Sequence, residues 1–279
     1  MEFFAGRKVV IATMHKKEEV IVPVLKQLGL IPVIPKYFDT DRFGTFSGEI
    51  ERLNDPLQTA RLKCKAASEQ YDCSLAISSE GSFGPHPGIL FASADDEIVV
   101  LSDLQNGLEF KARIVTTNTN FYGAVMKSWQ DVEQFANAAL FPSHAIIARK
   151  EKNALDGIVK GIHTWEKLRE VALTYLHTQE QFFLETDMRA MFNPTRMKVI
   201  EEVTLKLLSS IRCLCPQCKT PGFDVIEVVA GLPCELCSLP TKSTLSHVFG
   251  CQKCNYTEER RYPHQKTCES PMYCDWCNP

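Results

Sequence analysis

The stretch from Ser78 to Pro87 carries the side chains that acid–base and phosphate chemistry uses. It contains the carboxylate of Glu80, the hydroxyls of Ser79 and Ser82, and the imidazole of His86. A short apolar run precedes it, whereas two glycines and two prolines within it oppose regular structure. Because ligands of α/β proteins bind where buried strands end in polar loops, this pattern predicts a site in a loop that follows a strand.

A second polar stretch lies near the start of the chain. Thr13, His15, Lys16 and Lys17 bring a hydroxyl, an imidazole and two ammonium groups to the beginning of a predicted helix at Glu18. The N-terminus of a helix attracts anions, so this loop is a candidate phosphate site. The alternative is a solvated turn whose lysines face water.

Charged residues also surround the end of a strand predicted at residues 182–186. They are Glu185, Asp187, Arg189 and Arg196. Four charges at one strand end form either a salt-bridge network or a site for a polar ligand, and we favour the network. The acidic triplet Asp95-Asp96-Glu97 is interpreted as a solvated turn before the next strand.

The cysteines form the most specific pattern in the sequence. Ten of the twelve follow Arg212, and eight of these occur as four C-x-x-C pairs. The pairs are Cys215 and Cys218, Cys234 and Cys237, Cys251 and Cys254, and Cys274 and Cys277. Two such pairs can enclose one tetrahedral Zn²⁺ with no open position. The sequence therefore predicts two structural zinc ions in a C-terminal zinc-ribbon module.

Spacing alone leaves the pairing of these knuckles open. A sequential arrangement joins the first pair with the second and the third with the fourth. An interleaved arrangement joins the first with the third and the second with the fourth, as in a RING-like cross-brace. We expect the sequential arrangement. Cys213, Cys268, His247 and His264 are alternative ligands, although buried thiols and ordinary imidazoles explain them as well.

The elements that must position these residues are those of an α/β fold. A continuous apolar strand at 8–12, a helix from Glu18 and a strand at 30–34 form the opening of a parallel sheet. Asp55 and Pro56 mark the start of a second helix. Later segments predict strands at 73–78, 98–101, 108–116, 145–148 and 182–186. They also predict helices at 128–139 and 165–177. We expect a mixed, mostly parallel sheet with flanking helices.

Length and charge bound the organisation and the partners. A chain of 279 residues is expected to form more than one unit, here an α/β domain at 1–212, with 150–212 as its extension, and a Cys-rich domain at 213–279. The latter holds six Lys or Arg against seven Asp or Glu, whereas a phosphate-binding surface is basic. This favours a protein partner over nucleic acid for the zinc module. No segment predicts a membrane span or a secretory signal, so we expect a cytosolic protein.

Three of these segments together resemble the inosine triphosphate pyrophosphatase superfamily. They are Thr13-x-His15-x-Lys17, the helix at 55–67, and Ile77-Ser-Ser-Glu80-Gly-Ser82-Phe83. The sequence departs from that family at His15, where Asn is usual, and at Glu80-Gly81-Ser82, which replaces its usual ending. The whole chain also resembles a bacterial zinc-ribbon-containing domain family of unknown function, which transfers no activity.

The resemblance to the pyrophosphatases implies a Mg²⁺-dependent phosphohydrolase or nucleotide-binding protein. It implies Glu80 as metal ligand or base, Lys17 or Lys16 as phosphate clamp, and Glu49 as a second carboxylate. Thr13 and Ser82 would donate hydrogen bonds to a phosphorylated small molecule. His15, Ser79, His86, Asp187, Arg189 and Arg196 complete the candidate substrate contacts. The alternatives are a non-enzymatic adaptor that binds a protein through its zinc module, and an RNA-binding or RNA-modifying protein.

Overall fold

The computed structural model describes residues 2–40, 43–44 and 54–279. The chain consists of two compact units, Met1–Leu208 and Ser209–Pro279. The candidate residue Glu49 lies outside the described residues. None of the described helices combines the length and the apolar character needed to cross a bilayer.

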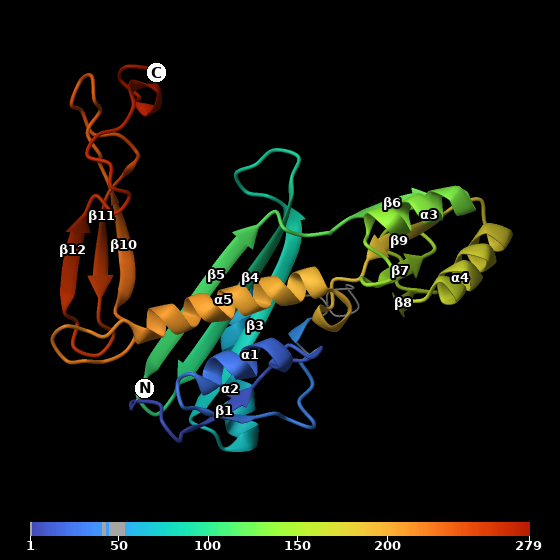
Figure 1. Cartoon of the computed structure of the whole chain (residues 1–279), viewed down its shortest axis with the longest axis horizontal. Coiled ribbons are helices and arrows are strands. Elements are labelled where there is room, and N and C mark those ends of the chain that lie inside the picture. The colour runs from blue at the N-terminus through green and yellow to red at the C-terminus, as the bar shows by residue number, and fades with distance from the viewer. Residues whose placement is uncertain (1, 41–42, 45–53) are drawn as a thin grey trace. The chain divides into compact units, whose positions relative to one another are not determined.

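The first unit is built on a five-stranded mixed sheet in the order β2-β1-β3-β4-β5 (Figure 1). β1 pairs in parallel with β2 and β3, whereas β3, β4 and β5 form a long antiparallel meander. The strands are β1 (Lys8–Ile11), β2 (Ile31–Val33), β3 (Leu75–Pro85), β4 (Ser93–Asp103) and β5 (Leu108–Thr116). The α/β class with a mixed sheet and flanking helices is thus confirmed, with more antiparallel pairing than expected.

Helices cover this sheet. They are α1 (Glu18–Lys26), α2 (Pro56–Tyr71) and α5 (Pro194–Arg212). α2 begins where the sequence predicts, with the Asp55 carboxylate accepting a hydrogen bond from the Gln58 amide at 2.9 Å. Its small residues, Ala60, Cys64 and Ala67, pack against Val10 and Ala76 of the strands.

A smaller antiparallel sheet, in the order β6-β9-β7-β8, belongs to the same unit. Its strands are β6 (Gly123–Met126), β7 (Ile146–Arg149), β8 (Val159–Ile162) and β9 (Phe182–Thr186). It buries a core with α3 (Trp129–Ala138) and α4 (Trp165–Thr178) that includes Phe135, Leu168 and Phe182. The capping box at Ser128 and Asp131 fixes the start of α3.

The second unit is organised around a three-stranded antiparallel sheet in the order β10-β11-β12. Its strands are β10 (Asp224–Ala230), β11 (Thr244–Gly250) and β12 (Thr257–Arg261). Because the strands are antiparallel, each one carries the chain from one end of this sheet to the other.

The loop expected from Ser78 to Pro87 is wrong, because most of it forms the second half of β3. Residues from Leu75 to Pro85 pair continuously with β4, from Asp103 back to Ser93. Backbone pairing with β4 overrides the local preference of the glycines for a turn. The same pairing places the acidic triplet at 95–97 inside β4, so its interpretation as a solvated turn is also wrong.

Candidate active site and metal centres

The polar residues of β3 alternate between the two faces of the sheet. The Ser78 hydroxyl donates to the Ala60 carbonyl of α2 at 2.8 Å, and the Glu80 carboxylate forms an ion pair with Lys63 of α2 at 2.5 Å. Ser79 points the other way, and its hydroxyl accepts a hydrogen bond from the Lys17 ammonium at 3.0 Å. Lys17 therefore reaches β3 at Ser79, whereas Glu80 is paired with Lys63, although the charge of Glu80 still acts on Lys17. That Lys17 and Glu80 open onto one hollow stays a prediction.

The face that carries Ser79 holds a buried charge cluster. We define it as Lys17, Ser79, Asp95, Glu97 and Arg196, all of which are buried. The Arg196 Nε donates to the Glu97 Oε1 at 2.6 Å, with both side chains fully buried. This ion pair joins α5 to β4.

Gly81 makes room for this ion pair. It lies opposite Glu97 in the register of β3 and β4. A Cβ atom built on Gly81 would lie 2.2 Å from the Glu97 Oε1 and 2.5 Å from the Arg196 Nη2. Only glycine lets the two charged groups lie directly over the strand.

Asp95 is the least satisfied member of the cluster. Its carboxylate has no exposed surface, and neither of its oxygens has a hydrogen-bond partner among the described residues. Burial, and then the charge of Glu97, raise the pKa of Asp95 to about 8. This carboxyl therefore keeps its proton at pH values well above those at which an aspartate normally ionises.

The loop after β1 lies beside this cluster. Burial, and then the charge of Arg196, lower the pKa of Lys17 to about 8. Burial, and then Lys17 and two arginines, lower the pKa of His15 to about 4, so this imidazole is neutral at physiological pH. His15 and Lys16 both adopt positive φ, which turns the loop sharply before α1.

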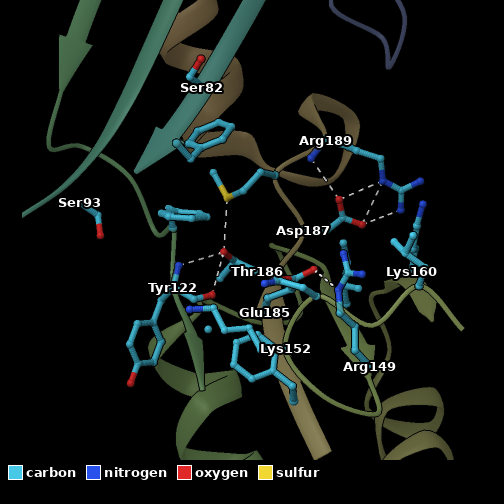
Figure 2. A pocket seen from close by; sticks show the side chains of 18 residues that line it. Ser82, Ser93, Tyr122, Arg149, Lys152, Lys160, Glu185, Thr186, Asp187 and Arg189 are labelled. Atoms are coloured by element: carbon cyan, nitrogen blue, oxygen red, sulfur yellow. Dashed lines mark hydrogen bonds and ion pairs between the residues drawn. The ribbon is translucent and has the colours of Figure 1, made fainter. Parts of the chain in front are cut away.

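A pocket of about 690 Å³ lies in the first unit. Figure 2 shows Arg149, Lys160 and Arg189 on one side of it, and Ser93 and Tyr122 on the other. Its lining also includes the aromatic rings of Phe83, Phe121 and Phe183.

The pocket combines cations with rings. Arg149 pairs with Glu185 at 2.7 Å and Arg189 with Asp187 at 2.6 Å. The predicted salt bridge is therefore confirmed for Asp187 and Arg189, whereas Glu185 and Arg196 pair with residues outside the predicted four. Lys152 and Lys160 add two further ammonium groups. The lining therefore carries four cations against two carboxylates.

The pocket adjoins the buried charge cluster through Phe83 and Met188. The Arg196 guanidinium lies over the Phe83 ring, 5.1 Å from its centroid, and also donates to the Met188 carbonyl. Both Phe83 and Met188 line the pocket. The cluster is thus the layer directly behind one wall of the pocket.

The structure brings together only part of the predicted site. Ser82, Asp187 and Arg189 line the pocket, whereas His15, Lys17, Ser79 and Arg196 lie beside or within the cluster. The remaining described candidates belong neither to the pocket lining nor to the cluster. Lys16 is exposed and lies next to Glu19, and the His86 ring accepts a hydrogen bond from the Gly88 amide in the β3–β4 connection. Thr13 has a buried hydroxyl with no described hydrogen-bond partner, and Glu80 faces α2.

Sequence reasoning missed Asp95, Glu97 and Arg149. The signal for the first two is the alternation of side chains along β4. Asp95 and Glu97 lie on the same face of the strand as the buried residues Val99 and Leu101. No local pattern marks Arg149 or Lys160, because β7 and β8 reach the pocket only through their place in the second sheet.

The cysteines of the second unit form two clusters of four thiols. The clusters are Cys215, Cys218, Cys251 and Cys254, and Cys234, Cys237, Cys274 and Cys277, with all sulfur atoms of a cluster within 4.8 Å of one another. The sulfur–sulfur distances between knuckles are 3.7 and 3.5 Å in the first cluster and 3.9 and 3.6 Å in the second. Zn–S bonds of about 2.3 Å in a tetrahedron give sulfur–sulfur edges of about 3.8 Å, so each cluster fits a zinc ion.

The expected sequential pairing of the knuckles is wrong, and the interleaved arrangement is present. β10 carries the chain from the first knuckle to the second, β11 returns it to the third, and β12 leads it away towards the fourth. The first and third knuckles therefore meet, as do the second and fourth. Cys213, Cys268, His247 and His264 belong to neither cluster.

The knuckles share a backbone geometry. In the first three, the residue after the second cysteine has positive φ and donates its amide to the carbonyl of the first cysteine. These residues are Lys219, Ser238 and Asn255. Asn278 makes the corresponding hydrogen bond to Cys274 at 2.9 Å. Such turns aim both sulfur atoms of a pair at one point.

The Gly81→Ala substitution is expected to destabilise the first unit by roughly 1–3 kcal/mol, because its Cβ displaces the Glu97–Arg196 ion pair. Urea denaturation measures the change. Gly84→Ala is the matched control on the same strand, since its Cβ would meet nothing within 4 Å. Equal stability of the two variants would contradict the packing described for Gly81.

The pairing of the knuckles is expected to appear in the zinc content of two double variants. Cys218→Ser with Cys251→Ser damages one cluster and should leave one zinc per chain. Cys218→Ser with Cys237→Ser damages both clusters and should leave none. Elemental analysis distinguishes them, and sequential pairing would give the reverse result.

Comparison with known proteins gives a family but no relative of known activity. No curated protein matches the chain. A family model described as "Domain of unknown function (DUF6671)" matches residues 63–279, which is well over half of the chain and includes β3, β4, the pocket and both cysteine clusters. The chain therefore belongs to the DUF6671 family.

Proposed function

We propose that the chain binds a phosphorylated small molecule of the nucleotide class in the pocket and hydrolyses its phosphoanhydride bond with the help of a divalent cation. The zinc clusters would support the second unit and take no part in the reaction, because four thiolates leave a zinc ion no open position. The resemblance of the loop after β1 and of the sequence of β3 to the inosine triphosphate pyrophosphatases supports the reaction class.

The observation that carries this proposal is the division of the pocket lining. Arg149, Lys160 and Arg189 lie together on one side, where they suit phosphate oxygens, and the lining also includes aromatic rings, which suit a flat heterocycle. Two of the cations are arginines held in place by Glu185 and Asp187. A preorganised guanidinium stabilises the charge that develops on a phosphoryl group without having to reorganise.

The residues of this chain would divide the work. Arg149, Lys160 and Arg189 would bind and orient the phosphates, and the rings of Phe83 and Phe121 would position the base. Phosphoryl transfer depends mostly on such positioning and on charge stabilisation. A bound divalent cation would supply additional positive charge at the phosphate oxygens.

Glu80 does not fit the role of the carboxylate that holds this cation. Its oxygen lies 2.5 Å from the Lys63 ammonium, and both groups are buried against α2. The carboxylate faces α2, on the opposite face of β3 from Ser79 and the buried charge cluster. No step of the proposed reaction is therefore assigned to Glu80.

Lys152→Ala and Lys160→Ala are expected to lower kcat/KM for the preferred nucleoside triphosphate by roughly 10-fold to 100-fold each, the effect of losing one charged hydrogen bond. Release of phosphate or pyrophosphate across a panel of nucleoside triphosphates with Mg²⁺ provides the measurement. Lys167→Ala is the control, because this exposed lysine pairs with Glu170 on α4 and does not line the pocket. Absence of nucleotide binding, or equal effects of all three variants, would refute the proposal.

A protein-binding role for the zinc module is the second candidate. Leu236 and Trp276, which sit inside the knuckles of the second cluster, are 73% and 71% exposed, and Met272 and Tyr273 beside them are also exposed. Clustered exposed apolar side chains are typical of a protein contact, and the charge balance of residues 213–279 disfavours nucleic acid.

This candidate predicts that Leu236→Ser together with Trp276→Ser abolishes a complex between the full chain and a purified partner, while the zinc content stays at two per chain. A complex that survives both substitutions would exclude this surface. RNA as the partner would instead show a steep dependence of binding on salt.

A further inference from the structure

Three buried carboxylate oxygens of β4 have no hydrogen-bond donor among the described residues. They are both oxygens of Asp95 and the Oε2 of Glu97. Neither residue has exposed surface. An ionised carboxylate left in this state is costly, so each such oxygen needs a proton, a water molecule or a cation.

The described hydrogen bonds of the two cations go to atoms other than the Asp95 oxygens. The Arg196 guanidinium serves the other oxygen of Glu97 and the Met188 carbonyl. The Lys17 ammonium serves the hydroxyl and the carbonyl of Ser79, at 3.0 and 3.2 Å. The positive charges that are present therefore leave the lone pairs of Asp95 without a described hydrogen bond.

The backbone brings both carboxylates to one face of the sheet. Asp95 and Glu97 are two residues apart on β4, so both side chains leave the sheet on the same face. Phe83 and Gly81 lie directly opposite them on β3. The Glu97–Arg196 ion pair occupies the space over Gly81, and Phe83 lines the pocket, so the carboxylates lie behind the pocket wall.

We propose that Asp95 and Glu97 hold a divalent cation of the hard, oxygen-preferring class, such as Mg²⁺ or Mn²⁺, beside the pocket. Carboxylate oxygens are the ligands these ions prefer, and such ions commonly use one or two carboxylates and complete their shell with water and substrate phosphate. The role of this ion in hydrolysis rests on the proposed function, whereas its binding does not.

The charge of the surroundings sets the conditions for binding. Lys17 and Arg196 already act on the two carboxylates, so a bound ion adds positive charge to a cluster that contains two cations. A polyanion in the adjoining pocket offsets that charge. Ion and phosphorylated ligand should therefore strengthen each other's binding by the same factor.

The test uses Mn²⁺ alone, added to the full chain with both cysteine clusters loaded with zinc, and follows the electron paramagnetic resonance signal of unbound Mn²⁺. The wild-type chain is expected to bind one Mn²⁺, and Asp95→Asn to weaken this binding at least tenfold. Asp96→Asn is the matched control. Asp96 lies between the two proposed ligands on β4, but it is paired with Arg113 at 2.6 Å and faces the other side of the sheet.

The folding control is built into the variant. Asp95→Asn keeps the shape of the side chain and leaves the Glu97–Arg196 ion pair intact, so its Tm should stay close to that of the parent. Equal Mn²⁺ affinity of Asp95→Asn and the parent, or an equal loss in Asp96→Asn, would overturn the proposal.

A parent chain that binds no Mn²⁺ would overturn it as well, and would assign the unpartnered oxygens to a proton shared by Asp95 and Glu97. Failure of the proposed function is distinguishable from these results. It would leave Mn²⁺ binding sensitive to Asp95→Asn while no nucleotide binds or reacts.

Discussion

The structure of the first unit depends on one buried ion pair, between Glu97 on β4 and Arg196 near the start of α5. A guanidinium does not lose its proton in proteins, so burying it requires a permanent partner. Removal of either member of such a pair typically costs about 3–5 kcal/mol, because the other charge stays buried. The pair fixes where α5 meets the sheet, and it makes glycine necessary at position 81.

The same interaction determines one wall of the pocket. Arg196 donates to the carbonyl of Met188 and lies over the ring of Phe83, and both of these residues line the pocket. The segment after β9 also carries Asp187 and Arg189, which form their own ion pair. A displaced Arg196 would therefore disturb the groups to which we assign phosphate binding.

Strand alternation divides the chemistry of the sheet between its faces. Ser78 and Glu80 contact α2, where Glu80 pairs with a lysine and the environment is structural. Ser79, Asp95 and Glu97 occupy the other face, where two carboxylates and two cations are buried behind the pocket. A register slip of one residue would exchange these two sets.

The sequence predicts features that local chemistry decides. The N-cap at Asp55, the helix that follows Ser128 and the four cysteine knuckles all appear where the residues predict them. It fails where distant strands decide the outcome. The polar half of β3 is a strand only because β4 pairs with it, and the knuckles interleave only because three antiparallel strands carry the chain between them.

The candidate site shows the same limit. Lys17, Ser79 and Arg196 are recognisable as candidates from their types, but Arg149 and Lys160 reach the pocket from strands of the second sheet that no local motif links to it. The local sequence around Asp95 and Glu97 is typical of a solvated turn, and only the full length of β4 shows that both residues lie within a strand.

The most direct test of the central claim, that the pocket is the ligand site, is a crystal structure of the full chain with a non-hydrolysable nucleoside triphosphate. The account predicts phosphate oxygens within hydrogen-bond distance of Arg149, Lys160 or Arg189 and the base against the aromatic lining. An empty pocket at a saturating concentration of nucleotide, or a nucleotide bound at another place on the chain, would contradict it.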